Sequence, residues 1–414
     1  MRGRIGCLLG IVCAWCVSCG EASAPTDATV PAQDEIEELR ALGYLDFSPK
    51  PADPSERGAR VLDRGRTMPG YRLYTSNMRC RATLIDLDGE VVHAWSHPCK
   101  RWMHSELLPD GHLLVSGTDP STSAGETDRP AERRFVLRLD WDGDVVWRAR
   151  IPAHHDVEQV PGGQVLALTR RVRSDHPFEA GTVLVDHGFE TLSADGERLD
   201  SISLYDLVVE NEIGFELEPV APRGRTRRLD VLHSNSIEAM RRPELADRHP
   251  LYSLDNVLIS LRHQDSIFIV DRRARKLVWA WGRGELSGPH DARVLDGGNF
   301  LIFDNGLARG RSRVVEVDPL RGEVVWSYDG GDEPFFTKQR GSSQRLPNGN
   351  HLVAVSNDGE AFEVAPDGEI VWRFWNPDIH ENGHREVIVR MVWVPAETVE
   401  PLLDGPGQPK AAQR

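Results

Sequence analysis

The chain has 414 residues, with 49 Lys and Arg against 64 Asp and Glu, which gives a net charge of -15 at pH 7. This acidic balance argues against nucleic acid and against an anionic membrane surface as partners. Hydrophobic residues make up 40% of the chain, which is enough for a large core. Repeat folds of this length are common.

The N-terminus has the pattern of an export signal. Positive residues in 1–4 precede an apolar run over 5–17, which is shorter than the roughly 20 residues that a membrane-spanning helix needs. We therefore predict residues 1–19 as an export signal and an exported protein, either periplasmic or anchored as a lipoprotein. Cys19 ends a segment resembling a lipoprotein box, but Cys16 stands where Leu is usual. Lipidation of Cys19 and plain cleavage both remain open.

Cysteine usage agrees with export. Four of the six cysteines lie in the leader, and only Cys80 and Cys99 remain in the body. Two cysteines in an exported chain favour one disulfide, Cys80–Cys99, over two free thiols.

The rest of the chain divides by composition. Residues 20–66 are rich in Ala, Pro, Asp and Glu, and we predict a disordered or partly helical tether there. Short β-type runs alternating with Asp-Gly and Gly-Gly turns fill residues 67–396, and residues 397–414 form a predicted C-terminal tail. Within the β region, the Arg-rich stretch from Tyr205 to Asp230 is predicted to be a long loop.

One phrase recurs through the β region, a hairpin with a tight turn that usually ends in Trp. Its copies lie at residues 84–95, 137–147, 192–199, 269–279, 315–326 and 362–372, the third without the Trp. A four-stranded repeat that ends in such a hairpin is typical of a β-propeller blade. The sequence therefore predicts an all-β, six-bladed β-propeller, with five or seven blades as alternatives if a blade is miscounted or hidden. Either the strand near Tyr71 or the strand over 386–394 is expected to complete a blade across the ends of the chain and close the ring.

A second phrase marks the strand that opens each blade and lines the central channel. Counting eight residues back from its turn glycine gives His155 and His290 in two blades, but Met103 and Gly341 in two others. His233 opens the fourth blade. His155, His233 and His290 are therefore predicted to converge in the channel. His104 is one residue out of this register and is left out, because such a shift turns a strand side chain to the other face.

These histidines allow several uses. A single one is more often structural, whereas three at one repeat position indicate a site, and three imidazoles also suit Zn. No carboxylate has to join them, so we predict no metal. Arg262 follows the His233 strand, where a guanidinium beside neutral imidazoles would bind an oxyanion, unless it only forms a surface salt bridge.

These motifs together resemble the bacterial arylsulfate sulfotransferases. The residues that carry the resemblance are His155-Asp, His233-Ser-Asn-Ser, Ser260-Leu-Arg-His-Gln and Pro289-His-Asp-Ala-Arg, together with the Asp-Gly-Glu-Val-Val hairpins. The resemblance runs from about residue 70 to 395. It implies a six-bladed propeller that transfers a sulfuryl group from a phenolic sulfate ester to a phenol through a sulfated histidine, without the nucleotide donor PAPS and without a cofactor.

The resemblance also implies roles for individual residues. His290 matches the nucleophile, and His155, His233, Asn235 and Arg262 match groups that hold the sulfuryl oxygens or move the proton. Which of His155 and His233 is the general acid stays open. The hydroxyls of the last blade that we expect near the substrate are Ser342 and Ser343. The extra N-terminal β-domain of well-known relatives has no counterpart here, so the oligomeric state is not predicted.

Two other classes of function remain as alternatives. One is a non-catalytic exported propeller that binds a ligand or a protein partner. The other is a quinoprotein dehydrogenase, whose propellers use similar Trp hairpins but usually have more blades and a calcium site. The partners predicted by the leading hypothesis are an aryl sulfate donor and a phenolic acceptor.

Overall fold

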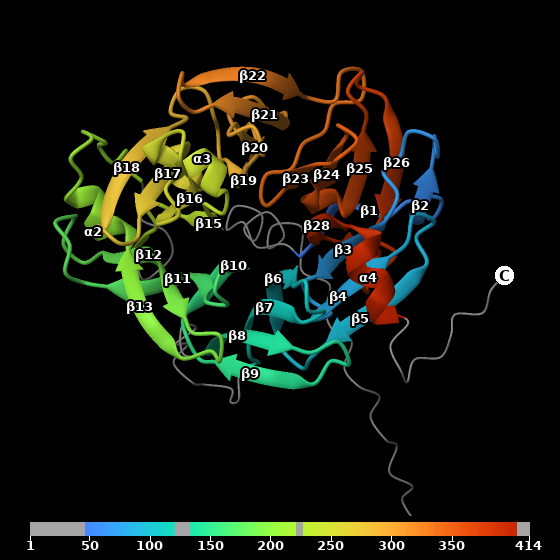
Figure 1. The fold of residues 1–414 in the computed structure, drawn as a ribbon, viewed down its shortest axis with the longest axis horizontal. Helices are drawn as coiled ribbons and strands as arrows, with labels where there is room; N and C mark the ends of the chain where they lie inside the picture. Colours follow the sequence, from blue (N-terminus) through green and yellow to red (C-terminus); the bar gives the residue numbers. More distant parts are fainter. Residues whose placement is uncertain (1–45, 121–132, 221–226, 404–414) are drawn as a thin grey trace, which may run out of the picture.

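The computed structural model describes residues 46–120, 133–220 and 227–403. The predicted export signal with Cys19, residues 20–45 of the predicted tether and the end of the predicted tail lie outside the described residues. The described strands form six sheets of four or five strands around a central axis, a β-propeller (Figure 1). The predicted fold class is confirmed.

Each blade is an antiparallel meander whose first strand lies nearest the axis (Figure 1). The first blade contains β28 (Ile388–Val394), β3 (Tyr71–Ser76), β4 (Arg81–Ile85) and β5 (Val91–Ser96). The second contains β6 (Arg101–Leu107), β7 (Leu113–Thr118), β8 (Arg134–Leu139) and β9 (Val145–Ala149). The third contains β10 (Ala153–Gln159), β11 (Val165–Arg173), β12 (Val183–Leu192) and β13 (Arg198–Ser203), with β14 (Arg228–Leu229) beside β12.

The second half of the ring repeats this plan. The fourth blade contains β15 (Ser234–Ala239), β16 (Asn256–Leu261), β17 (Ser266–Asp271) and β18 (Lys276–Trp281). The fifth contains β19 (His290–Val294), β20 (Phe300–Asp304), β21 (Arg313–Asp318) and β22 (Glu323–Tyr328). The sixth contains β23 (Ser342–Arg345), β24 (His351–Val355), β25 (Glu360–Val364) and β26 (Ile370–Trp375).

The helices are short and lie in the connections between strands, except α4, which follows the last strand. They are α2 (Leu204–Val209), α3 (Pro243–Ala246), α4 (Ala396–Leu403), η2 (Pro250–Tyr252), η3 (Arg262–Gln264) and η4 (Ser356–Asp358). In the described part of the chain, none of the helices has the length and apolar character needed to cross a membrane. The predicted loop from Tyr205 to Asp230 contains most of α2 and the short strand β14.

Two features of the repeat hold the ring together. The last strand, β28, pairs with β3 in the first blade, with Val394 opposite Tyr71, so β28 is the strand that closes the ring, beside the strand that begins at Tyr71. The predicted hairpins form the third and fourth strands of every blade, counted from the axis. Their tryptophans also link blades, because Trp95 donates to the Asp140 carbonyl at 3.0 Å and Trp372 to the Leu87 carbonyl at 2.8 Å.

The boundaries of the predicted tether and tail need correction. Part of the tether belongs to the propeller: β2 (Gly58–Val61) adds a fifth strand to the sixth blade, and β1 (Phe47–Pro51) pairs with β27 (His384–Glu386). The outer edge of β26 offers unpaired backbone groups, which β2 satisfies although its own sequence has little strand character. The predicted tail begins as α4, which buries Val399 against the first two blades.

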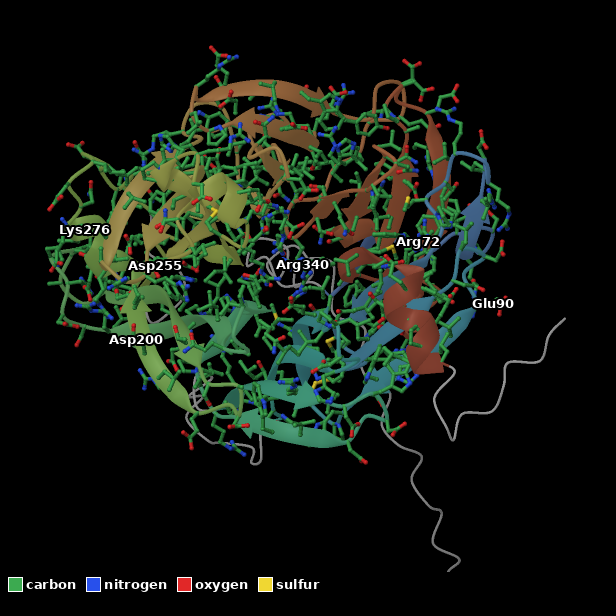
Figure 2. All side chains as sticks on the ribbon, viewed as in Figure 1. Arg72, Glu90, Asp200, Asp255, Lys276 and Arg340 are labelled. Atoms are coloured by element: carbon green, nitrogen blue, oxygen red, sulfur yellow. A yellow bond between two sulfur atoms is a disulfide. The ribbon has the colours of Figure 1, made fainter. Side chains whose placement is uncertain are left out.

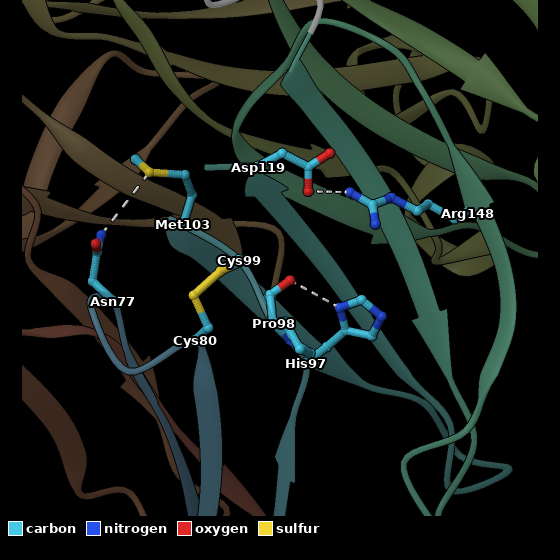
Figure 3. The surroundings of a disulfide bond; sticks show 8 residues. All are labelled: Asn77, Cys80, His97, Pro98, Cys99, Met103, Asp119 and Arg148. Atoms are coloured by element: carbon cyan, nitrogen blue, oxygen red, sulfur yellow. Dashed lines mark hydrogen bonds and ion pairs between the residues drawn. A yellow bond between two sulfur atoms is a disulfide. The ribbon is translucent and has the colours of Figure 1, made fainter. Parts of the chain in front are cut away.

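The predicted disulfide is present (Figure 3). Cys80 lies just before β4 in the first blade, and Cys99 lies just before β6 in the second. The bond therefore spans the connection between two neighbouring blades.

Candidate active site

The inner strands bring the predicted histidines to one end of the channel. His155 lies in β10, His290 begins β19, and His233 directly precedes β15. The ring centroids of His155 and His233 are 5.5 Å apart. Burial lowers the pKa of His155 well below its ordinary value, and the nearby His233 and His290 lower it further. The three histidines thus share one electrostatic environment.

The hydrogen bonds of His290 define its tautomer. Its Nδ1 lies 3.0 Å from the Gly288 carbonyl and 2.7 Å from Oδ1 of Asn305, and a carbonyl can only accept, so Nδ1 carries the proton. Nε2 accepts the backbone N–H of Arg340 at 3.2 Å, which agrees with a lone pair on that nitrogen. Arg340 lies near the centre of the ring (Figure 2).

Burial keeps His290 neutral. It lowers the pKa of the imidazole to about 3, and the positive charge of Arg262 acts in the same direction. A neutral imidazole with a free electron pair on Nε2 is the nucleophilic form of histidine. The side chain is therefore held as a nucleophile at neutral pH.

Arg262 and Asn235 connect His233 to His290. The backbone N–H of Arg262, at the start of η3, donates to the His233 carbonyl at 3.1 Å, and its guanidinium lowers the pKa of both His233 and His290. Asn235 donates from Nδ2 to the Pro289 carbonyl at 2.9 Å, directly before His290. Its Oδ1 is buried without a hydrogen-bond partner among the described residues, so it is available to a ligand.

The predicted serines face the neighbouring blade and strand. Ser342 accepts a hydrogen bond from the Met391 N–H at 3.4 Å, and the Ser343 N–H donates to Asp291 at 3.0 Å. Ser343 also lines a cavity of about 300 Å³ that the histidines of the site do not line. The expected contact between these serines and the site is therefore not observed; in this blade, the Arg340 backbone contacts His290.

A layer of buried ion pairs lies next along the channel. Arg390 binds Asp156 and Asp291 and donates to Nε2 of His104 at 2.9 Å, and Arg293 pairs with the same carboxylates. These carboxylates follow His155 and His290 directly in sequence. His104 therefore also lies in the channel, in this layer and apart from the three site histidines.

Sequence reasoning missed four residues of the site, which are His154, His187, Asp230 and Asn305. Strand register predicts that one residue of each opening strand points into the site. In the third blade two neighbouring residues do so: His155 has a φ of 63°, and the centroid of its ring lies 3.8 Å from that of His154. This left-handed conformation cancels the usual alternation of strand side chains. The His154-His155 pair was a visible signal for His154. His187 lies on β12, the third strand of its blade, and Asn305 directly follows β20, and the opening phrase includes neither.

Two clusters of side chains in the site have the donor spacing of a metal centre. Two groups of described residues have donor atoms within 4.8 Å of one another, namely His154, His155 and His233, and His187, Asp230 and His233. In the second group the donors already hydrogen-bond to each other. Beside the first, the charges of Arg170 and Arg134 add to burial in lowering the pKa of His154. Positive charge around neutral imidazoles favours an oxyanion over a cation.

Three solved structures resemble this chain at low sequence identity, and only the first of them supports the fold. A protein of unknown function from Bacteroides caccae has 14% identity and a TM-score of 0.50, covering 78% of this chain and 98% of that one. A streptogramin B lyase has 11% identity and a TM-score of 0.45, covering 84% and 97%. The Cps50 (Swd1) β-propeller domain of Myceliophteria thermophila has 13% identity and a TM-score of 0.44, covering 83% and 99%.

None of the curated protein sequences matches the chain significantly. A family model, described as Arylsulfotransferase (ASST), matches residues 134–377, which is more than half of the chain and includes His155, His233, Arg262 and His290. The chain therefore belongs to the arylsulfotransferase (ASST) family.

Proposed function

We propose that this chain is an exported arylsulfate sulfotransferase that moves a sulfuryl group from a phenolic sulfate ester to a phenol, with His290 as the carrier. Family membership supports arylsulfotransferase activity. The observation that carries the mechanism is the hydrogen-bonding of His290, whose Nδ1–H is held by two acceptors while its Nε2 keeps a lone pair. No cofactor and no nucleotide donor takes part.

The first half-reaction forms the N–S bond. Nε2 of His290 attacks sulfur, the bond from sulfur to the phenolic oxygen breaks, and the electron pair leaves with the phenolate. Positive charge develops on the imidazole ring, and the Gly288 carbonyl and Asn305 Oδ1 stabilise it at Nδ1–H. In the second half-reaction an acceptor phenol attacks the same sulfur and releases His290.

The groups around His290 stabilise the transferring sulfuryl. Its oxygens spread negative charge in the transition state, as phosphoryl oxygens do, and Arg262 supplies a fixed positive charge beside them. The Arg340 backbone N–H, which lies at Nε2, is placed to donate to a sulfuryl oxygen once the N–S bond has formed. Two half-reactions through one histidine predict ping-pong kinetics.

Export is part of the proposal. The predicted leader and the disulfide Cys80–Cys99 both support an oxidising compartment outside the cytosol, since disulfides rarely persist in reducing ones. A lipid on Cys19 would hold the protein at a membrane, and fractionation of cells with mass analysis of the N-terminal peptide distinguishes this from a free periplasmic protein.

The test of the mechanism is intact-protein mass after brief exposure to 4-nitrophenyl sulfate without acceptor. Wild type is expected to gain one sulfuryl group and release nitrophenol, with the modification mapped to His290. His290→Ala should gain nothing, and His112→Ala, a surface histidine on a turn of the second blade, should behave as wild type. Lack of both adduct and nitrophenol in wild type, across several aryl sulfates, would favour a non-catalytic binding propeller.

A further inference from the structure

Asp230 is the centre of a hydrogen-bonded group of histidines beside the site. Its Oδ2 accepts from Nδ1 of His233 at 2.7 Å, and its Oδ1 accepts from Nε2 of His187 at 2.9 Å. Its backbone carbonyl accepts from Nδ1 of His263 at 2.6 Å. One residue thus orients three imidazoles, one of which belongs to the proposed sulfuryl site.

The partners of these rings show which nitrogen remains available. His187 completes its bonding through Nδ1, which lies 3.1 Å from the Ser234 hydroxyl. The second ring nitrogen of His263, Nε2, accepts a hydrogen bond from Arg262 at 2.9 Å. His233 differs, because its Nδ1–H is held by Asp230 and Nε2 has no hydrogen-bond partner among the described residues. The lone pair of His233 is therefore on Nε2 and available to a ligand.

The charges make this pair suited to proton transfer. Burial alone would raise the pKa of Asp230, but His233 and His187 hold it well below its ordinary value, so the carboxylate is ionised. Burial lowers the pKa of His233 to about 3, although Asp230 opposes that shift. An ionised carboxylate at Nδ1 stabilises the imidazolium that forms when Nε2 takes a proton.

His155 lacks such support. No hydrogen bond or ion pair joins its ring to a carboxylate of the described residues, although its buried Nε2, like that of His233, has no hydrogen-bond partner there. The adjacent carboxylate, Asp156, is directed to the Ile237 N–H and to Arg390. Two histidines that look equivalent in the sequence therefore have different surroundings.

We propose that Asp230 is a positioning residue that makes His233, and not His155, the proton-transfer group of the sulfuryl transfer. This inference rests on the proposed function. Asp230 also helps to hold Arg262 in place. His263 accepts a hydrogen bond from Arg262 at Nε2 and donates from Nδ1 to the backbone carbonyl of Asp230. His155 then helps to hold the sulfuryl group and neither gives nor takes a proton in the reaction.

The proton balance closes over one cycle. In the first half-reaction, protonated Nε2 of His233 gives its proton to the phenolate as the sulfur–oxygen bond breaks, which releases a neutral phenol. In the second, the acceptor phenol returns a proton to Nε2 as its oxygen attacks sulfur, and the electron pair of the N–S bond returns to His290. His233 is neutral in the free protein and takes this proton from solvent when the sulfate monoanion binds beside it, and the second half-reaction of each cycle returns it.

Leaving-group dependence tests the role of Asp230. Nitrophenolate leaves readily without a proton, whereas the more basic phenolate of 4-methylphenyl sulfate needs one. We expect Asp230→Asn to lower kcat for 4-methylphenyl sulfate about 100-fold or more, in the range of general acid–base effects, and kcat for 4-nitrophenyl sulfate less than about tenfold. His233→Gln should show the same selective loss. His155→Gln should slow both donors by similar factors.

The matched control is Asp186→Asn. Asp186 is a similarly buried carboxylate in the same blade, which accepts from the Ser203 hydroxyl at 2.8 Å and makes no hydrogen bond to the site histidines. This variant should leave the ratio of the kcat values for 4-methylphenyl sulfate and 4-nitrophenyl sulfate unchanged. An equal loss with both donors in Asp230→Asn, or a selective loss in His155→Gln alone, would overturn the proposal.

A second measurement does not depend on turnover. Imidazole ¹⁵N NMR of the folded protein should show His233 with a protonated Nδ1 and an unprotonated Nε2 in wild type, and a mixture of tautomers in Asp230→Asn. If wild type transfers no sulfuryl group, the proposed function fails, and the spectrum still decides whether Asp230 positions His233. An unchanged His233 signal in the variant would show that it does not.

Discussion

Asn305 holds the proton of His290 on Nδ1, together with the Gly288 carbonyl. Its Oδ1 accepts from Nδ1 of His290 at 2.7 Å, while its Nδ2 donates to the Thr337 and Arg340 carbonyls, each at 2.8 Å. Because those carbonyls accept only from the amide nitrogen, the oxygen has to face the imidazole. Asn305, from the end of β20, therefore presents the lone pair of His290 to the channel.

Asn305→Ala is expected to slow sulfation of His290 about 10- to 100-fold, because a lost hydrogen bond to a group that becomes charged corresponds to about 1.5–3 kcal/mol. Single-turnover mass measurements with 4-nitrophenyl sulfate report the rate. Asn350→Ala is the control, since Asn350 is a buried amide in the sixth blade that bonds Arg66 and Glu363. It should lose stability yet keep the rate, and equal loss of rate in both variants would contradict the role of Asn305.

The pH dependence of His290 sulfation should lack the usual histidine inflection. Burial lowers the pKa of His290 to about 3, whereas an exposed imidazole titrates near 6.5. Protonation removes the nucleophile, so the rate would fall only as the pH approaches the lowered value. With 4-nitrophenyl sulfate, which needs little acid assistance, the single-turnover rate is expected to stay flat from pH 7 to pH 5. A fall in the single-turnover rate that follows the protonation of one group near pH 6.5 would show that His290 titrates as an exposed histidine.

Arg390→Met should destabilise the protein by roughly 3–5 kcal/mol, because it leaves two buried carboxylates, Asp156 and Asp291, with reduced compensation. Urea unfolding measures this change. Arg345→Met removes an arginine that is 46% exposed and pairs with Glu316, and it should cost no more than about 1 kcal/mol. Equal losses in the two variants would mean that the central layer contributes no more than a surface pair.

Removal of the disulfide should weaken the junction between the first two blades. Cys80 and Cys99 are 19 residues apart, and closing a loop of similar length stabilises a protein by about 3 kcal/mol. The double variant Cys80→Ser/Cys99→Ser is therefore expected to unfold at lower urea concentration than the oxidised wild type. Reduced wild type should match the variant. If the variant unfolds at the wild-type midpoint, the bond does not limit the freedom of the unfolded chain.

The sequence by itself determined the propeller and three of the histidines in its site, His155, His233 and His290. Tight turns, the recurring Trp hairpin and alternation along each strand are local properties, and repetition makes them readable without contacts between distant residues. The opening strands gave His155, His233 and His290 from the residues themselves, and Arg262 from its place after His233. The resemblance then matched His290 with the nucleophile. The sequence did not reveal the strand character of residues 58–61. β2 forms there because the edge of β26 is available to pair with it.

Only the tertiary structure decided how each histidine is used. The left-handed backbone at His155 brings His154 into the site, contrary to strand alternation. Asp230 and Asn305 reach the rings of His233 and His290 from segments outside the repeated opening phrase. Tautomer and charge depend on burial and on partners distant in sequence, and these exist only once the blades have closed around the channel.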